Sequence, residues 1–232
     1  MLNENAPLPL DILSTLPGSE NVMDHSVSVD GARWRREITS RELPPIAGKL
    51  SEEDRTTLTR REVFEIGDLE QTPENAFQLL YYSLAWGLGM RASRLSTRLD
   101  HLASSSEEAS KLLVEAWTSV RTSSSTSVAY RTLTTDKGAG RIPQLGPAFA
   151  TKFLYFAQGP TSEPRHLILD EVVATNLQRD AWPDSPPAAW WPETYERYCS
   201  LLARWAVEAS EDPQVGRTVR ADEIEMALFT RK

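Results

Sequence analysis

A lysine amine and a carboxylate are the side chains of this sequence best placed to perform chemistry. Lys152 lies in the apolar segment PAFATKFLYFA, and Asp170 follows it, directly after the apolar run at 167–169. An ammonium among phenylalanines is partly desolvated, which favours the neutral, nucleophilic form of the amine. Such an amine attacks electrophilic carbon and forms Schiff bases. The ordinary alternative is a lysine whose stem covers the phenylalanines while its charge stays in water.

Two helices are predicted to hold these side chains. At 100° per residue, Phe149, Phe153 and Phe156 fall within about 60° of one another, and Lys152 lies about 40° beyond the edge of this stripe. Asp170 precedes the helical pattern of residues 171–179 and is predicted to be its N-cap. A capping carboxylate uses one oxygen, so its second oxygen stays free for another role.

A turn precedes the lysine helix. Residues 142–147, IPQLGP, separate two helical patterns, and Pro147 suits the first position of the second helix. The sequence therefore predicts a helix-hairpin-helix over about residues 128–157. Backbone N–H groups at the start of the second helix would bind an anion such as a DNA phosphate, without reading base identity. The residues expected to contact DNA are Lys137, Arg141, Gln144 and Gly146.

The hairpin, the lysine and the aspartate together resemble the helix-hairpin-helix DNA glycosylases of the 8-oxoguanine class. PAFATKFLYFA, with its lysine six positions after the hairpin glycine, is most similar to the archaeal 8-oxoguanine glycosylases and to a bacterial group with the same fold. The specific match is confined to the stretch 138–170, and a weaker pattern extends over most of the chain. Gln144 departs from the family, in which many members have glycine at this position.

The resemblance implies roles for these residues and for the partner. The lysine, here Lys152, attacks C1′ of the damaged nucleotide, and the aspartate, here Asp170, assists departure of the base and stabilises the charge that develops on the sugar. The partner implied is double-stranded DNA with a modified base, bound by a monomer. No cofactor is implied, apart from a monovalent cation that the hairpin could hold. The base pocket is expected at Trp86, Gly87 and Phe149.

Composition limits the class of protein. The net charge of −8 argues against a non-specific nucleic-acid coat protein. The stretch 130–152 nevertheless holds four basic side chains and one acidic side chain, a local charge of +3. The single cysteine, Cys199, excludes an internal disulfide framework, and neither a signal peptide nor an apolar span of about 20 residues is visible. We therefore expect a soluble cytoplasmic protein without a membrane partner, and no zinc motif, phosphate loop or nucleophile elbow suggests other chemistry.

The remaining sequence predicts a mainly α-helical fold of about ten helices in two lobes with a cleft between them. Residues 1–50, rich in proline, are expected to be an irregular segment with a short strand or hairpin near residues 27–31. Residues 51–232 are expected to form the helical domain. Helices are predicted to begin near residues 51, 59, 73, 105, 128, 192 and 220, and Arg91, Arg94 and Arg98 to share one basic helical face. Trp34 is expected to be exposed and to cover a helix end.

Three functions remain open from the sequence. The first is a glycosylase with associated β-lyase chemistry on an oxidised purine. The second is the same chemistry on another modified base, for example phage DNA in antiviral defence. The third is a DNA-binding or partner module without catalysis. Selectivity for a base depends on a pocket that a flipped nucleotide enters, which the sequence does not locate.

Overall fold

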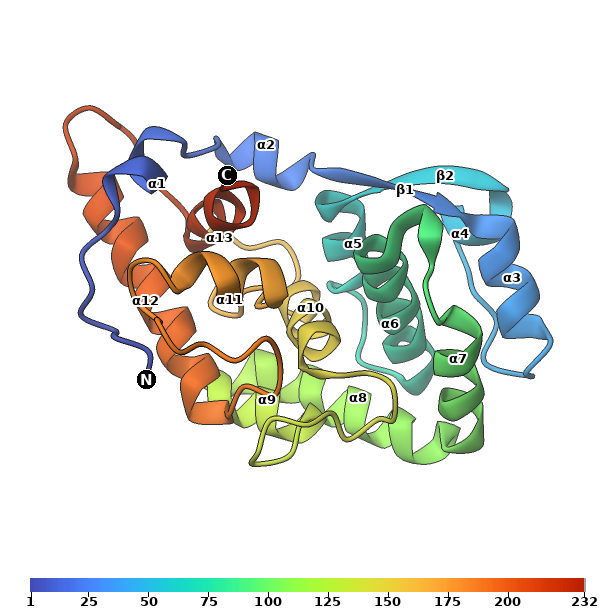
Figure 1. Cartoon of the computed structure of the whole chain (residues 1–232). Helices are drawn as coiled ribbons and strands as arrows, with labels where there is room; N and C mark the ends of the chain where they lie inside the picture. Colours follow the sequence, from blue (N-terminus) through green and yellow to red (C-terminus); the bar gives the residue numbers. More distant parts are fainter. Residues whose placement is uncertain (232) are drawn as a thin grey trace.

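The fold is mainly helical in the part of the chain that the computed structural model describes, residues 1–231. These residues form thirteen α-helices, a short 3-10 helix and two strands (Figure 1). This confirms the predicted fold class. The helices after the midpoint of the chain are α8 (Ser106–Thr122), α9 (Thr126–Leu133), α10 (Pro147–Ala157), α11 (Glu171–Leu177), α12 (Pro192–Glu211) and α13 (Ala221–Thr230).

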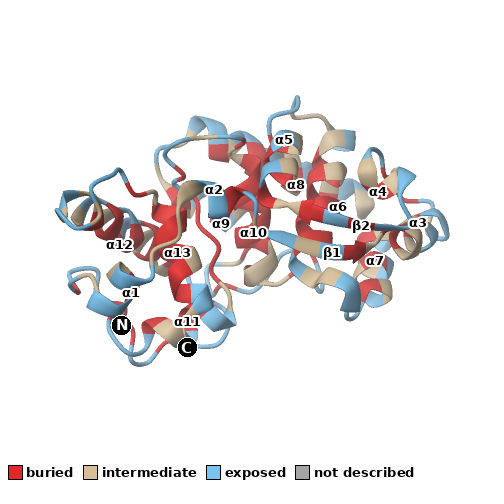
Figure 2. Cartoon of the chain, turned by 90° about the horizontal axis from the view of Figure 1, so that it is seen from above, coloured by how far each residue is buried: buried red, intermediate tan, exposed pale blue. Residues whose placement is uncertain are grey.

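Helix α10 lies at the centre of the molecule. In Figure 1 it separates a group formed by α11, α12 and α13 from a group formed by α5 (Arg60–Ile66), α6 (Pro73–Leu88) and α7 (Leu95–Ser104). Buried residues run through α10 into both groups (Figure 2), and they form one continuous apolar cluster. Because α10 is covered on nearly every side, a polar side chain on it is held inside the protein rather than at its surface.

The N-terminal segment, residues 1–50, is more regular than its prolines suggest. It contains α1 (Leu10–Ser14), α2 (Ser19–Met23), β1 (Ser26–Asp30) and α3 (Gly31–Thr39), and α4 (Lys49–Glu52) begins at its end. The expectation of an irregular segment is therefore wrong, because each element is short enough to fit between prolines. The predicted short strand near residue 27 is confirmed.

The partner of that strand was not predicted. Strand β2 (Arg55–Thr59) pairs antiparallel with β1, with Ser26 opposite Thr59 and Asp30 opposite Arg55. A helix beginning at Ser51 was predicted here and is wrong, since α4 ends at Glu52. The next predicted start is confirmed: the hydroxyl of Thr59 accepts from the backbone N–H of Glu62, whose side chain accepts from Thr59 in return.

Two further expectations in this half of the molecule are wrong. Trp34 is 0% exposed and belongs to the core, because α3 packs it beneath the sheet and α7. The predicted basic helical face does not form, because its three arginines do not share a helix. Arg91 ends the 3-10 helix Gly89–Arg91, Arg94 has a left-handed backbone with φ of 54°, and only Arg98 lies within α7.

The hairpin before α10 is longer than predicted. Helices α9 and α10 are where the helix-hairpin-helix pattern placed them, but residues 134–146 connect them, with an isolated β-bridge between Thr134 and Gly140. The turn itself is closed by a hydrogen bond from Leu145 N–H to the carbonyl of Ile142, at 3.0 Å. Gln144 has φ of 63°, a left-handed conformation that costs a residue with a Cβ atom about 1–2 kcal/mol.

The described residues contain no helix that is long and apolar enough to cross a membrane.

Cys199, on α12, is a buried free thiol. Burial raises its pKa to about 12, so it is an unreactive thiol at neutral pH.

Candidate active site

Lys152 is a buried lysine. It lies in the second turn of α10, which begins at Pro147 in the first helical position, and the residue is 7% exposed. The alternative interpretation, in which the charge of Lys152 stays in water, is therefore wrong. The stripe of three phenylalanines is only part of the apolar surface, since the neighbours of Lys152 on both sides are buried as well.

Asp170 divides its two carboxylate oxygens between two tasks. Oδ1 accepts hydrogen bonds from the backbone N–H groups of Val172 and Val173, both at 3.2 Å, and so caps α11. Oδ2 lies 3.1 Å from Nζ of Lys152. The predicted N-cap is confirmed, and the second oxygen meets the lysine amine. Because the cap fixes the carboxylate, the direction of Oδ2 is set by the backbone of α11.

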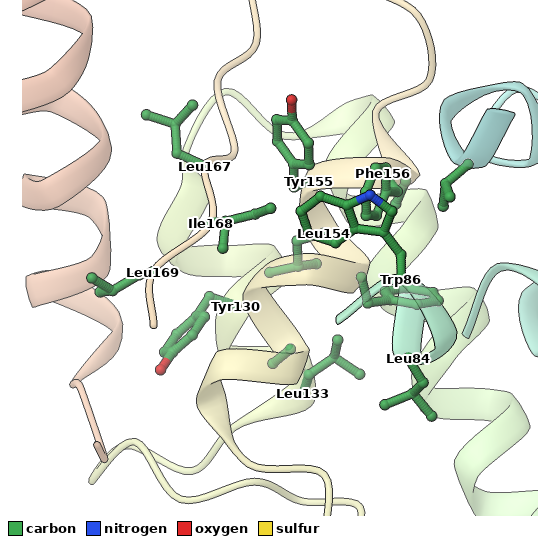
Figure 3. Packing of buried hydrophobic residues seen from close by; sticks show 14 of the residues in the cluster. Leu84, Trp86, Tyr130, Leu133, Leu154, Tyr155, Phe156, Leu167, Ile168 and Leu169 are labelled. Atoms are coloured by element: carbon green, nitrogen blue, oxygen red, sulfur yellow. The ribbon is translucent and has the colours of Figure 1, made fainter. Parts of the chain in front are cut away.

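An extended segment that ends at Asp170 brings the aspartate to the lysine. The hydroxyl of Thr151 donates to the carbonyl of Leu169 at 3.0 Å and accepts from its N–H at 3.2 Å. On the other side, the hydroxyl of Tyr198, on α12, donates to the carbonyl of Ile168 at 2.6 Å. Figure 3 shows this segment running between α10 and α12. Its polar backbone groups are thus bound on both sides, which fixes the position of the aspartate that follows.

Lys152 and Asp170 line a pocket of about 280 Å³. Its walls come from both groups of helices and from the start of β1. The lining residues are His25, Val27, Arg60, Trp86, Gly87, Leu88, Gly89, Lys152, Ile168, Asp170, Glu225 and Phe229. Trp86 and Gly87, expected to form the pocket, are therefore among its walls. Phe149 is not among them, and lies instead beneath the guanidinium of Arg98, 4.8 Å from the ring centre.

Gly87 makes room for the lysine stem. A Cβ atom on Gly87 would lie 2.9 Å from Cδ of Lys152 and 3.2 Å from its Cε. The first distance is shorter than real Cβ contacts and the second is tighter than most, so the lysine stem would have to shift. The glycine therefore serves the close approach of α6 and α10, in addition to any approach of a ligand.

An ion pair between Arg60 and Glu225 forms one side of the pocket. Their closest atoms are 2.7 Å apart, and each side chain is 1% exposed. The guanidinium also donates to the hydroxyl of Tyr155 at 3.1 Å and lies 5.1 Å from the ring centre of Trp86. Burial raises the pKa of Glu225, although Arg60 opposes the shift. The arginine thus joins α5, α6, α10 and α13 at the pocket.

Among the pocket residues that the sequence did not identify are His25, Arg60, Glu225 and Phe229. Glu225 and Phe229 are four positions apart on α13 and share a face of that helix. This spacing was a signal, although it is common in amphipathic helices. His25 lies in no motif, and Arg60 lies inside the Thr59–Glu62 cap, which indicates a helix start and not a pocket. Only the pairing of β1 with β2 brings the two residues near each other, and Arg60 N–H donates to the carbonyl of His25 at 3.1 Å.

The residues expected to contact DNA lie in the connection before α10. They differ in exposure and in the hydrogen bonds that their side chains already make. Lys137 and Gln144 are exposed. Nε of Arg141 donates to the carbonyls of Thr134 and Arg131, at 2.9 and 3.1 Å, so its side chain partly holds the connection itself. Gly146 is the N-cap of α10 and has an open space where a Cβ atom would be.

Comparison with known proteins identifies a family. A family model described as "Putative 8-oxoguanine DNA glycosylase OGG-like protein" matches residues 20–229, and this range includes every residue of the pocket. No curated protein and no solved structure matches the chain.

Proposed function

Since the chain belongs to the 8-oxoguanine DNA glycosylase OGG-like family, we propose that Lys152 and Asp170 remove an oxidised purine from DNA. The observation that carries the proposal is the contact of 3.1 Å between the buried amine and a carboxylate fixed by its own helix cap, at the wall of a pocket. A nucleophile and a charged partner in such a pocket match the needs of bond cleavage at the sugar carbon of a flipped nucleotide.

In the proposed reaction the neutral amine of Lys152 attacks C1′ of the damaged nucleotide. The electron pair of the glycosidic bond leaves with the base, and the departing base takes up the proton that the attacking nitrogen loses. The developing positive charge on the sugar is stabilised by the carboxylate of Asp170. Because two backbone N–H groups hold Oδ1, the carboxylate needs little rearrangement when this charge appears.

The lyase step follows from the bond formed by the lysine. The aminal at C1′ opens to a Schiff base between Lys152 and C1′, and O4′ becomes a hydroxyl group. The imine makes a proton at C2′ acidic, and loss of that proton expels the 3′ phosphate by β-elimination. Water as the nucleophile would give neither the covalent link nor this elimination.

The connection before α10 supports a duplex DNA partner. The exposed Lys137, the partly engaged Arg141 and the N-terminus of α10 at Gly146 lie together in sequence before the catalytic helix. Backbone N–H groups at a helix start bind phosphate without reading the base. The base itself would then be recognised in the pocket, with Trp86 as a flat wall. We propose that the protein acts as a monomer.

A panel of duplexes tests the proposal. Each duplex carries one modified base, and release of the base and cleavage of the strand are measured separately. We expect release of 8-oxoguanine with strand cleavage, both dependent on Lys152. Release of a different modified base would retain the chemistry and change the substrate, as in a role against phage DNA. Binding to every duplex without release of any base would leave a DNA-binding module and refute the enzyme proposal.

Gly87→Ala is expected to slow base release while changing the stability of the fold little. Alanine stabilises a helix relative to glycine by at most about 1 kcal/mol, and the added Cβ atom would lie 2.9 Å from Cδ of Lys152, so the lysine stem must shift and this gain is offset. Displacement of a reacting group by about 1 Å costs about 10²-fold in rate. Single-turnover kinetics and thermal unfolding measure the two effects. Gly18→Ala is the matched control, because nothing lies within 4 Å of a Cβ atom there. Wild-type rates for Gly87→Ala would show that the lysine stem moves without consequence.

A further inference from the structure

One polar side chain of the pocket has no partner. Lys152 pairs with Asp170, and Arg60 pairs with Glu225, so the four charged residues of the pocket are committed to one another. Nε1 of Trp86 points to a backbone carbonyl, that of His25, at 3.5 Å. Within residues 1–231, Nδ1 of His25 is buried without a hydrogen-bond partner, and so is Nε of Arg60, although other atoms of Arg60 are paired. A buried polar atom without a partner costs about 1–3 kcal/mol unless something binds it.

The ring of His25 is held in place from several directions. Its backbone donates to the carbonyl of Val22 at 3.3 Å, and its own carbonyl accepts from Arg60 N–H at 3.1 Å. The ring stands edge-on to Trp86, with 5.4 Å between ring centres and 81° between planes, and lies 6.5 Å from the ring of Phe229. The imidazole is therefore a fixed group at a pocket whose charged side chains are already in ion pairs.

Resting on the function proposed above, we propose that His25 hydrogen-bonds the flipped base as a neutral imidazole and determines which bases are excised. A ligand that bonds to this ring breaks no existing ion pair of the pocket, whereas one that bonds to the charged residues competes with their partners. A neutral imidazole offers one donor and one acceptor, so it distinguishes bases by the polar atoms on the edge that faces it. Bases that leave the ring without a partner bind less tightly.

The surroundings of the ring favour its neutral form. Burial lowers the pKa of His25 below its ordinary value of 6.5, and the charge of Arg60 lowers it further. The charged groups of the pocket come from four elements: Arg60 from α5, Lys152 from α10, Asp170 at the start of α11 and Glu225 from α13. A lowered pKa keeps the ring neutral at pH 7. Protonation as the pH falls below 6.5 replaces the acceptor with a donor and adds a positive charge beside Arg60.

The test compares two reactions of the same protein. DNA with an abasic site needs Lys152 and contains no base, whereas excision needs both the lysine and base recognition. For His25→Phe we expect kcat/KM for base excision to fall by about tenfold to a hundredfold, the scale of one lost hydrogen bond to a substrate. Borohydride trapping on abasic DNA should stay within about twofold of wild type. His25→Gln, which keeps a donor and an acceptor, should recover part of the loss.

Acidic pH provides the second readout. In the wild type the ratio of excision to abasic trapping should decrease as the pH drops through the lowered pKa of His25, and in His25→Phe the ratio should be independent of pH. His101→Phe, on α7 and outside the pocket, is the matched control and should change neither reaction. Wild-type excision by His25→Phe, or an equal loss of both reactions, would overturn the role of His25 alone. A wild-type protein that neither excises nor traps would instead overturn the proposed function, and the role of His25 with it.

Discussion

Lys152→Gln is expected to abolish covalent trapping of the protein on DNA by borohydride. The reagent reduces a Schiff base to a stable secondary amine, and an amide side chain forms no Schiff base. Base release should fall by about 10³-fold or more, the scale on which enzymes lose activity when a nucleophile is removed. Denaturing gels of the reduced protein–DNA mixture measure the covalent product. Glutamine keeps most of the stem beside Gly87, so the variant should fold and bind damaged DNA without turnover.

Lys49→Gln is the control for this substitution. Lys49 also forms an ion pair, 2.7 Å from Glu62, but it is not among the walls of the pocket. This variant should be trapped as the wild type is, and mass spectrometry of the trapped peptide should identify residue 152. Trapping through a different lysine, together with full activity of Lys152→Gln, would leave Lys152 with the structural contacts of α10 only.

Local patterns predicted the parts of the site that depend on local structure. The aspartate before the Val-Val-Ala run at 172–174 indicated a helix cap, and the cap is what directs the second oxygen of Asp170. Pro147 indicated the first turn of α10, and the Thr59 cap indicated α5. Such patterns are reliable because they depend on hydrogen bonds and backbone angles within a few residues, and not on the remaining chain.

Burial and long-range contacts were harder to predict. A helical stripe shows which face is apolar, but the covering of the opposite face by other elements decides whether Lys152 or Trp34 reaches solvent. His25, Arg60 and Glu225 meet at the pocket from near the two ends of the chain, with hydrogen bonds or ion pairs that no sequence spacing encodes. Strand β2, RTTLT, alternates exposed and buried residues, so the sequence does contain the period-two pattern of a strand. The capping pattern at Ser51 outweighed it and led to the prediction of a helix.

Asp170→Asn is expected to slow base release by about 10²–10³-fold while DNA affinity stays near that of the wild type. The asparagine oxygen can still accept from Val172 and Val173, so α11 keeps its cap. The change removes the negative charge that stabilises the sugar in the transition state, and the binding of phosphates does not use that charge. Single-turnover release and equilibrium binding, measured on the same duplex, separate the two effects.

Removing this carboxylate is also expected to lower the free energy of unfolding. A buried ion pair that loses one partner costs about 3–5 kcal/mol when the remaining charge stays buried. The variant keeps the cap of α11, so we expect the loss in the free energy of unfolding to be no larger than this. Asp30→Asn is the matched control, because Asp30 caps α3 by accepting from Arg33 N–H at 2.8 Å and has no lysine beside it. If both variants lose only a little stability and both release the base at the wild-type rate, Asp170 is a cap and nothing more.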